Sequence, residues 1–162
     1  MPNNETEKIK SAPKPAFRLT AHKLRGYGLV ILAVVLLVFL ASAFFGHPTK
    51  SLKIGDAKYS LRVARTEAEH RRGLGGTQPL TAEQGMVFIY KEPRELCFWM
   101  KDMSYAIDII WLDADKKVTA IEKNVDPATY PKTFCHDGSY VIELRSGEAV
   151  RHNLEQGQTL SF

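Results

Sequence analysis

The sequence lacks the short motifs that mark most catalytic and metal sites. It contains no C-x-x-C or H-x-x-x-H pair, no Gly-rich phosphate-binding loop and no G-x-S-x-G nucleophile turn. Its histidines are scattered, so no metal ligand set and no cofactor site are predicted. Asp113-Ala114-Asp115 resembles the opening of a calcium loop, but the glycine and the closing glutamate of such a loop are missing. We therefore expect an ordinary turn there.

Net charge is also absent from most of the chain. Residues 46–162 contain 16 Lys and Arg and 16 Asp and Glu, whereas residues 1–27 contain six basic and two acidic residues. The formal net charge of +4 therefore belongs entirely to the N-terminal segment. A neutral domain exerts no long-range attraction on a polyphosphate, so the charge distribution excludes nucleic acid as a partner.

One long apolar run stands out near the N-terminus. Leu29–Phe45 contains no charged residue and no proline, and with the two residues before it approaches the ~20 residues that cross a bilayer as a helix. We expect a single transmembrane helix over residues 27–46. Basic residues precede it, which predicts that residues 1–26 form a cytoplasmic, disordered tail and that the remainder is extracytoplasmic.

A cleaved signal peptide is the alternative to an uncleaved signal anchor. Ala41-Ser42-Ala43 has the A-x-A form of a cleavage site, and a cut after Ala43 would secrete the domain. Apolar residues continue to Phe45, beyond that point, which favours the anchor. Both interpretations place the following domain outside the cytoplasm, and the predicted location is the cell membrane.

Residues 47–50 are expected to form a linker and residues 51–162 a β-rich exported domain. Thr66 and Glu69 match a capping box and predict a short helix that continues to Arg72 and ends at Gly73. β-branched and aromatic residues predict strands at 51–54, 59–64, 85–90, 96–100, 107–112, 118–123, 140–144 and 158–162. Residues 124–138 are expected to form a loop. The predicted fold is mostly β (β-rich α+β), a small barrel- or sandwich-like domain with short helices.

Several segments of this domain resemble a known family. They are Glu69–Leu74 (EHRRGL), Gly85–Phe88 (GMVF), Phe98–Met103 (FWMKDM), Ile107–Trp111 (IDIIW) and Tyr140–Leu144 (YVIEL), followed by Gly147 and Gly157. Over residues 52–162 the sequence resembles uncharacterised protein family 0127, also called domain of unknown function 192. The resemblance implies a compact β-rich domain, often exported or membrane-anchored, without an established activity.

The sequence departs from the family pattern at two places. Asp102-Met103 stands where Asn-Thr is usual, and Tyr105-Ala106 stands where Pro-Leu or Pro-Ile often precedes the aspartate. A mechanism that needs an amide side chain at position 102 is therefore not expected in this chain.

The candidate ligand site is a group of polar residues around Trp99. Lys101 and Asp102 follow the strand that contains Trp99, and Asp108 opens the next long strand. If these two strands pair, a lysine lies between two carboxylates beside an aromatic wall formed by Trp99 or Trp111, a combination suited to a small polar ligand. The alternative is an ion-paired turn with both tryptophans in the core.

Arg72 is a further candidate for this site. It lies at the end of the predicted helix, where the helix dipole favours a cation. It also lies beside the Gly73–Gly76 loop, where it can contact an anion. Both roles remain open from the sequence.

Cys97 and Cys135 are the only cysteines, and in an exported domain two cysteines usually pair. We predict a disulfide that connects the 124–138 loop to the sheet. The catalytic alternative uses either cysteine as a nucleophile with His136 as base.

The leading functional hypothesis is a membrane-anchored, extracytoplasmic binding or accessory domain whose partner, besides the membrane, is a small polar ligand or an envelope component. The first alternative is an enzyme that hydrolyses an envelope polymer with Asp102 and Asp108 as acid and base. The second is a structural partner of another membrane protein.

Overall fold

A computed structural model describes residues 30–32, 34–35 and 48–162. The chain divides into two compact units, Met1–Gly46 and His47–Phe162. In the first unit the described residues are helical. No helix within the described ranges combines the length and the apolar character that a membrane span requires. Most of the predicted transmembrane segment and the whole of the predicted tail lie outside the described residues.

The second unit is mostly β-structure with short helices. Its elements are β1 (Thr49–Ile54), β2 (Ala57–Ala64), α2 (Glu67–Arg72), β3 (Gln84–Trp99), β4 (Ile107–Leu112), β5 (Val118–Val125), the 3-10 helix η1 (Pro127–Thr129), β6 (Thr133–Arg145) and α3 (Glu148–Arg151). The strands form one open six-stranded sheet in the order β1-β2-β3-β6-β4-β5. Of the two architectures named from the sequence, a sandwich would require a second sheet, and the described strands form one.

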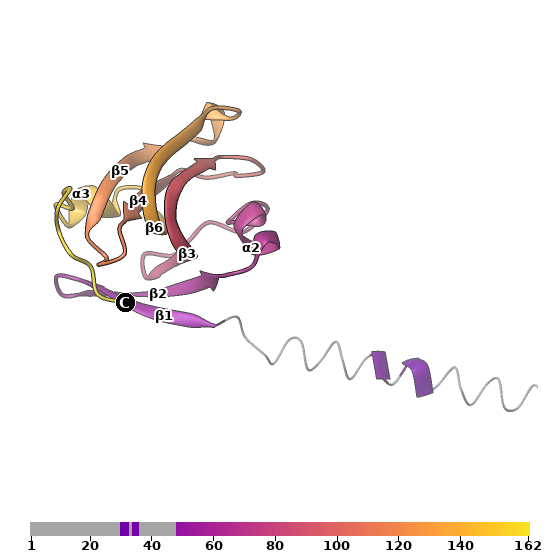
Figure 1. The fold of residues 1–162 in the computed structure, drawn as a ribbon. Helices are drawn as coiled ribbons and strands as arrows, with labels where there is room; N and C mark the ends of the chain where they lie inside the picture. The colour runs from indigo at the N-terminus through magenta and orange to yellow at the C-terminus, as the bar shows by residue number, and fades with distance from the viewer. Residues whose placement is uncertain (1–29, 33, 36–47) are drawn as a thin grey trace, which may run out of the picture. The chain divides into compact units, whose positions relative to one another are not determined.

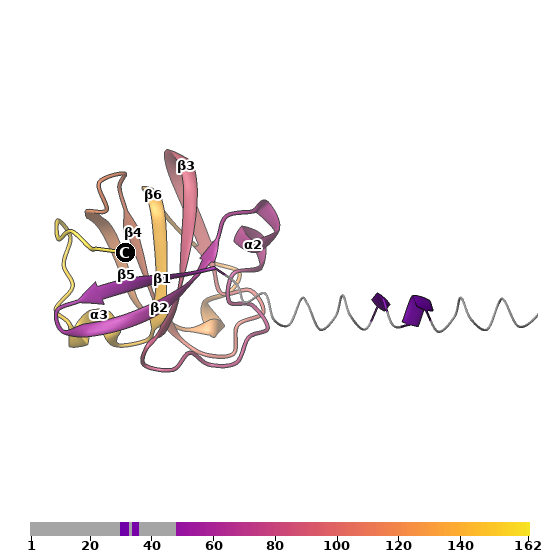
Figure 2. The same ribbon diagram turned by 90° about the horizontal axis from the view of Figure 1, so that it is seen from below.

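Strand β6 lies at the centre of this sheet. It pairs antiparallel with β3 on one side and with β4 on the other, while β2 and β3 are parallel. The β1–β2 hairpin crosses the direction of the other strands (Figures 1 and 2). Near the C-terminus, isolated bridges join Ser161 to Lys53 of edge strand β1 and Thr159 to Lys117, the residue just before edge strand β5.

Both faces of the central strands are buried. Along β6, Val141 belongs to one core cluster, whereas Ile142 and Leu144 belong to the other. The same alternation holds in β4, where Ile109 and Ile110 enter different clusters. Since successive side chains of a strand point to opposite faces, a near-continuous apolar run is required when both faces are covered.

The structure contains the helix cap and the turns that were predicted from neighbouring residues alone. The side chain of Thr66 accepts from the Glu69 backbone amide, and the helix ends at Gly73 as the capping box predicts. Gly55 and Asp56 form the predicted turn between β1 and β2. The turn before β5 is also present, with Asp113 Oδ1 accepting two backbone amides.

Several predicted boundaries were wrong. The strand predicted at residues 158–162 is reduced to two isolated bridges, at Thr159 and Ser161. Residues 85–90 and 96–100 are not two strands but parts of β3, whose pairing with β6 shifts register between Ile89 and Arg94. The predicted loop 124–138 is shorter, because β6 begins at Thr133. The predicted linker 47–50 already contains the start of β1 at Thr49. β3 and β6 are extended by their pairing with each other, two segments far apart in sequence, whereas β1 is extended by its hairpin partner β2.

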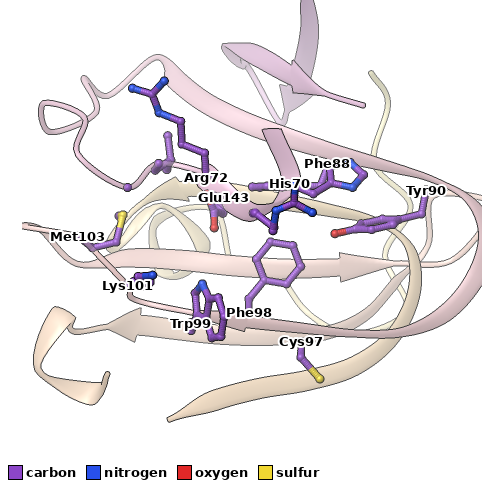
Figure 3. A pocket seen from close by; sticks show the side chains of 14 residues that line it. His70, Arg72, Phe88, Tyr90, Cys97, Phe98, Trp99, Lys101, Met103 and Glu143 are labelled. Atoms are coloured by element: carbon purple, nitrogen blue, oxygen red, sulfur yellow. The ribbon is translucent and has the colours of Figure 1, made fainter. Parts of the chain in front are cut away.

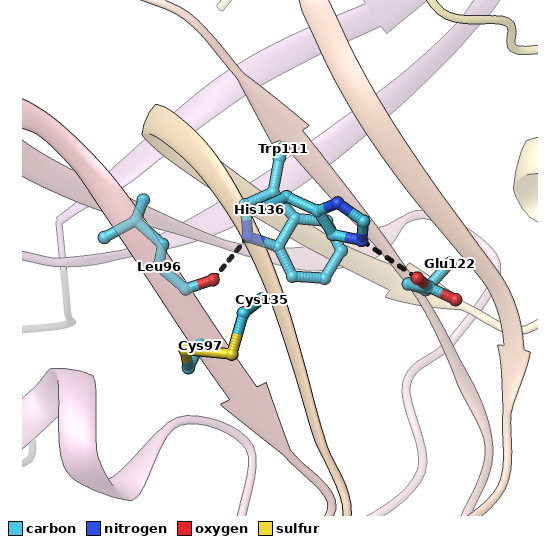
Figure 4. Close-up of a disulfide and its surroundings, with 6 residues drawn as sticks. All are labelled: Leu96, Cys97, Trp111, Glu122, Cys135 and His136. Atoms are coloured by element: carbon cyan, nitrogen blue, oxygen red, sulfur yellow. Dashed lines mark hydrogen bonds and ion pairs between the residues drawn. A yellow bond between two sulfur atoms is a disulfide. The ribbon is translucent and has the colours of Figure 1, made fainter.

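The predicted disulfide between Cys97 and Cys135 is confirmed. We expected it to connect a loop to the sheet. Instead it joins two strands, because the cysteines lie opposite each other on β3 and β6 (Figure 4). His136, the proposed base, instead pairs with Glu122 at 2.9 Å. The cysteine nucleophile is therefore excluded while this bond is intact.

Replacing both cysteines, Cys97→Ala with Cys135→Ala, should lower the free energy of unfolding. The bridge closes a separation of 38 residues, which corresponds to about 3–4 kcal/mol in the chain-entropy model. Urea unfolding of the full chain measures the difference, and reductant should destabilise the parent but not the double variant. Thiol labelling of both cysteines in unreduced protein would contradict the bond.

Candidate functional site

The loop after α2 lies against the loop after β3. The backbone amide of Gly76 donates to the carbonyl of Asp102 at 2.8 Å. A Cβ atom at Gly75 would lie only 3.0 Å from the Arg72 carbonyl and 3.1 Å from that of Lys101, so this close approach requires glycine. The contact brings the end of α2 and the residues after β3, which are distant in sequence, to one place.

Arg62 of β2 holds the C-terminal end of α2 in place. Its guanidinium donates to the Gly73 carbonyl at 3.0 Å and contacts the Met86 sulfur at 3.3 Å. The helix end is thus held by β2 as well as by the loop contact. This arrangement leaves a cavity between α2, β3 and β6.

The cavity has a volume of about 180 Å³, far above the ~10–15 Å³ that one water needs. Aromatic side chains form much of its wall, and charged side chains lie at its opening and its floor. The principal lining residues are His70, Arg71, Arg72, Leu74, Phe88, Tyr90, Phe98, Trp99, Lys101, Met103 and Glu143 (Figure 3). An apolar cleft with a few polar groups is the usual form of a small-molecule site.

Glu143 forms the floor of this cavity. It lies on central strand β6, opposite Met86 of β3 and Ile109 of β4, and its exposed fraction is 4%. Its Oε2 atom is buried without a hydrogen-bond partner among the described residues. Burial raises the pKa of Glu143 to about 8, and the charge of Arg62 lowers it by less. The side chain is therefore mostly neutral at pH 7.

Two other polar side chains line the wall beside Glu143. The Nε2 atom of His70 lies 3.2 Å from the Ala64 carbonyl, while its buried Nδ1 has no partner in the described part of the chain. Burial raises the pKa of Tyr90 to about 12, partly offset by Arg94, whose guanidinium carbon lies 4.7 Å from the ring centroid. Glu143 and His70 both line the cavity, and each has one buried polar atom that no described side chain satisfies.

A more open hollow of about 510 Å³ adjoins the cavity. Arg71, Arg72, Gly75, Trp99 and Lys101 line both, and Asp102 lines only the outer one. Four residues nominated from the sequence, Arg72, Trp99, Lys101 and Asp102, are therefore brought together. Trp99 is 48% exposed and forms a wall of the cavity. This agrees with the interpretation of Trp99 as an aromatic wall, not with its interpretation as a core residue.

Asp108 is not part of this group, contrary to the sequence prediction. Strands β3 and β4 do not pair, because β6 lies between them. Asp108 lies opposite Leu144 and faces the other core. Its carboxylate accepts from the Asn124 amide at 2.8 Å and from the Ala149 amide at 2.7 Å, so it anchors α3 to β4.

Trp111 is likewise a core residue and not a ligand wall. It is fully buried, and its indole N–H donates to the Leu96 carbonyl at 2.9 Å. This hydrogen bond satisfies the single polar atom of the side chain. Only one of the two tryptophans is therefore available to a ligand.

Sequence reasoning missed Glu143 as a site residue. It lies within the run Tyr140–Leu144, which was interpreted as a strand and as part of the family resemblance but not as a source of site residues. A lone acidic residue in the otherwise mostly apolar run Tyr140–Leu144 was the available signal, since Glu is almost never fully buried without a partner.

No three His, Cys, Asp or Glu side chains in the described ranges are grouped closely enough to hold a metal ion. The groups that can hold an organic ligand are Glu143 at the floor and Arg72 and Lys101 at the opening. Neither cation has an ion-pair partner among the residues that the structure describes.

Glu143→Gln should flatten the pH dependence of stability. In the folded chain Glu143 holds a proton up to about pH 8, whereas its ordinary pKa is 4.5. Stability from the protonated group is therefore fully present below about pH 4.5 and is lost as pH rises through about 8. Between pH 5 and pH 8 the parent should lose on the order of a few kcal/mol more unfolding free energy than the variant. Urea titrations followed by tryptophan fluorescence measure this.

Glu95→Gln is the matched control, because Glu95 is exposed on β3. It should keep the pH slope of the parent. An unchanged slope in Glu143→Gln would show that Glu143 does not retain its proton in the folded chain.

The comparisons with known proteins agree with the fold. No curated protein matches the chain. A solved structure from Sinorhizobium meliloti 1021, described as a "putative transcription regulator", has a TM-score of 0.66 at 20% identity and covers 72% of this chain and 95% of its own. A protein of unknown function from Novosphingobium aromaticivorans DSM 12444 has a TM-score of 0.62 at 26% identity, covering 70% of this chain and 84% of its own. The family model DUF192, uncharacterized ACR, matches residues 50–162. The chain therefore belongs to the DUF192 family.

Proposed function

We propose that this chain is a membrane-tethered, extracytoplasmic binding or accessory module that holds a small polar ligand in the cavity above Glu143. The observation that carries the proposal is the Glu143 carboxyl. It is buried at the floor of an aromatic cavity, and one of its oxygens has no partner in the described part of the chain. A native protein rarely leaves a buried polar atom unsatisfied, so a ligand that bonds to it compensates for a real cost.

The membrane tether is supported by the sequence. Leu29–Phe45 is apolar and uncharged, and the basic residues precede it. The positive-inside rule then assigns the N-terminus to the cytoplasm and residues 47–162 to the outside. The disulfide in the second unit is consistent with an oxidising compartment.

Binding is favoured over hydrolysis by the arrangement of the carboxylates. The alternative enzyme uses Asp102 and Asp108 as an acid–base pair. Both oxygens of Asp108 accept backbone amides on the opposite face of the sheet, so Asp108 does not face Asp102 across the hollow. A general acid–base pair must reach the same substrate bond from two sides.

Co-purification from native membranes should yield a small molecule bound to the parent chain. The full chain is extracted in mild detergent, and its bound compounds are identified by mass spectrometry after denaturation. Lys101→Ala and Glu143→Met should each carry less of that compound per chain than the parent, since they remove the two ends of the site.

Lys53→Ala is the control, because Lys53 is exposed on β1 and lines none of the described hollows. It should retain the compound at the level of the parent. If parent and Lys101→Ala carry equal amounts of the compound per chain, the cavity is not the binding site.

The topology has its own test. The full chain should remain in the membrane after alkaline carbonate washing, and externally added protease should digest residues 47–162 while the N-terminal tail stays protected. A soluble product that begins after Ala43 would instead establish cleavage and secretion.

A further inference from the structure

We propose that the ligand of this cavity is a small phenolic acid: an aromatic carboxylate whose acid group lies at the opening beside Arg72 and Lys101 and whose hydroxyl bonds to Glu143 at the floor. This inference rests on the proposed binding function and names its ligand class. Three features of the cavity lead to it.

The first feature is the charge at the opening. Arg71, Arg72 and Lys101 line both the cavity and the outer hollow, whereas Asp102 is the one acidic residue that lines the outer hollow. Arg71 already pairs with Glu67 at 3.6 Å, which leaves Arg72 and Lys101 for a ligand. The potential at the opening is therefore positive, and it favours an anion over a cation.

The second feature is the wall. Phe88 and Phe98 are buried with their rings 4.8 Å apart in an edge-to-face arrangement, and Trp99 closes the side near Lys101 (Figure 3). Aromatic walls of this kind suit a planar ring, because edge-to-face contacts add to the burial of apolar area. A ligand with an aliphatic or strongly hydrated central part would not form these edge-to-face contacts.

The third feature is the polar floor. Glu143 Oε2 and His70 Nδ1 are buried and unsatisfied by the residues that the structure describes, and both side chains line the same cavity. A hydroxyl both donates and accepts, so it bonds to the Glu143 carboxyl whether that carboxyl is protonated or ionised. The floor therefore selects a hydroxyl at the end of the ligand opposite to its acid group.

Four probes of nearly equal size separate these features: 4-hydroxyphenylacetate, phenylacetate without the hydroxyl, 4-ethylphenol without the charge, and tyramine with the opposite charge. Their affinities are measured by calorimetry on the full chain in lipid nanodiscs. We expect 4-hydroxyphenylacetate to bind tightest, phenylacetate about tenfold weaker from the lost hydrogen bond, and tyramine weakest. Added salt should weaken the two acids and leave 4-ethylphenol unchanged.

Variants assign each feature to its residue. Glu143→Met should remove the preference for 4-hydroxyphenylacetate over phenylacetate, whereas Glu143→Gln, which keeps a donor and an acceptor, should retain most of it. Arg72→Ala and Lys101→Ala should each weaken both acids about threefold and spare 4-ethylphenol. Arg145→Ala, at the exposed end of β6, is the control and should change nothing.

The outcomes also separate this inference from the function on which it rests. If 4-ethylphenol or tyramine binds as tightly as the acids, the acid assignment is overturned while the cavity remains a binding site. If none of the four probes binds, the phenolic ligand class is overturned, and the binding function is judged by co-purification from native membranes.

Discussion

The structure depends on the position of β6. This strand is hydrogen-bonded on both sides and covered on both faces, so each of its inward side chains must be apolar or must have its polar atoms satisfied. Val141, Ile142 and Leu144 meet that requirement as core residues. Glu143 does not meet it by itself. The raised pKa of its carboxyl is a consequence of this placement, and the same side chain forms the floor of the cavity.

A buried carboxyl without a partner destabilises the domain, and an apolar residue of similar volume would remove that cost. A disulfide and a buried carboxylate anchor stabilise the surrounding structure. The Cys97–Cys135 bridge joins β3 and β6 on the same strand pair, and Asp108 anchors α3 to β4 from the opposite face. A strained or costly group that is retained within a well-supported scaffold is typical of a functional site.

The sequence predicted those elements whose signals are local. The capping box at Thr66 and the turn at Gly55 need only neighbouring residues, and both were placed correctly. The length of β3, the early start of β6 and the insertion of β6 between β3 and β4 depend on pairing between distant segments, which local patterns do not encode. The assignment of Asp108 to the candidate ligand site around Trp99 was wrong for that reason. Glu143 was missed because its role appears only when both faces of its strand are known to be buried.

The opening of the cavity, here called the rim (Arg72 and Lys101), and its floor (Glu143) differ in how freely their residues can be replaced. Arg72 and Lys101 are exposed at the ends of α2 and β3, and their side chains can be exchanged at little cost to the fold. Glu143 lies in the central strand, where a change in size or polarity alters the packing against Met86 and Ile109. Substitutions at the rim can therefore change which charge the protein recognises without disturbing the fold. Substitutions of Glu143 at the floor also change the core. Within this fold, relatives that keep the floor and change the rim should bind ligands of similar shape but different charge.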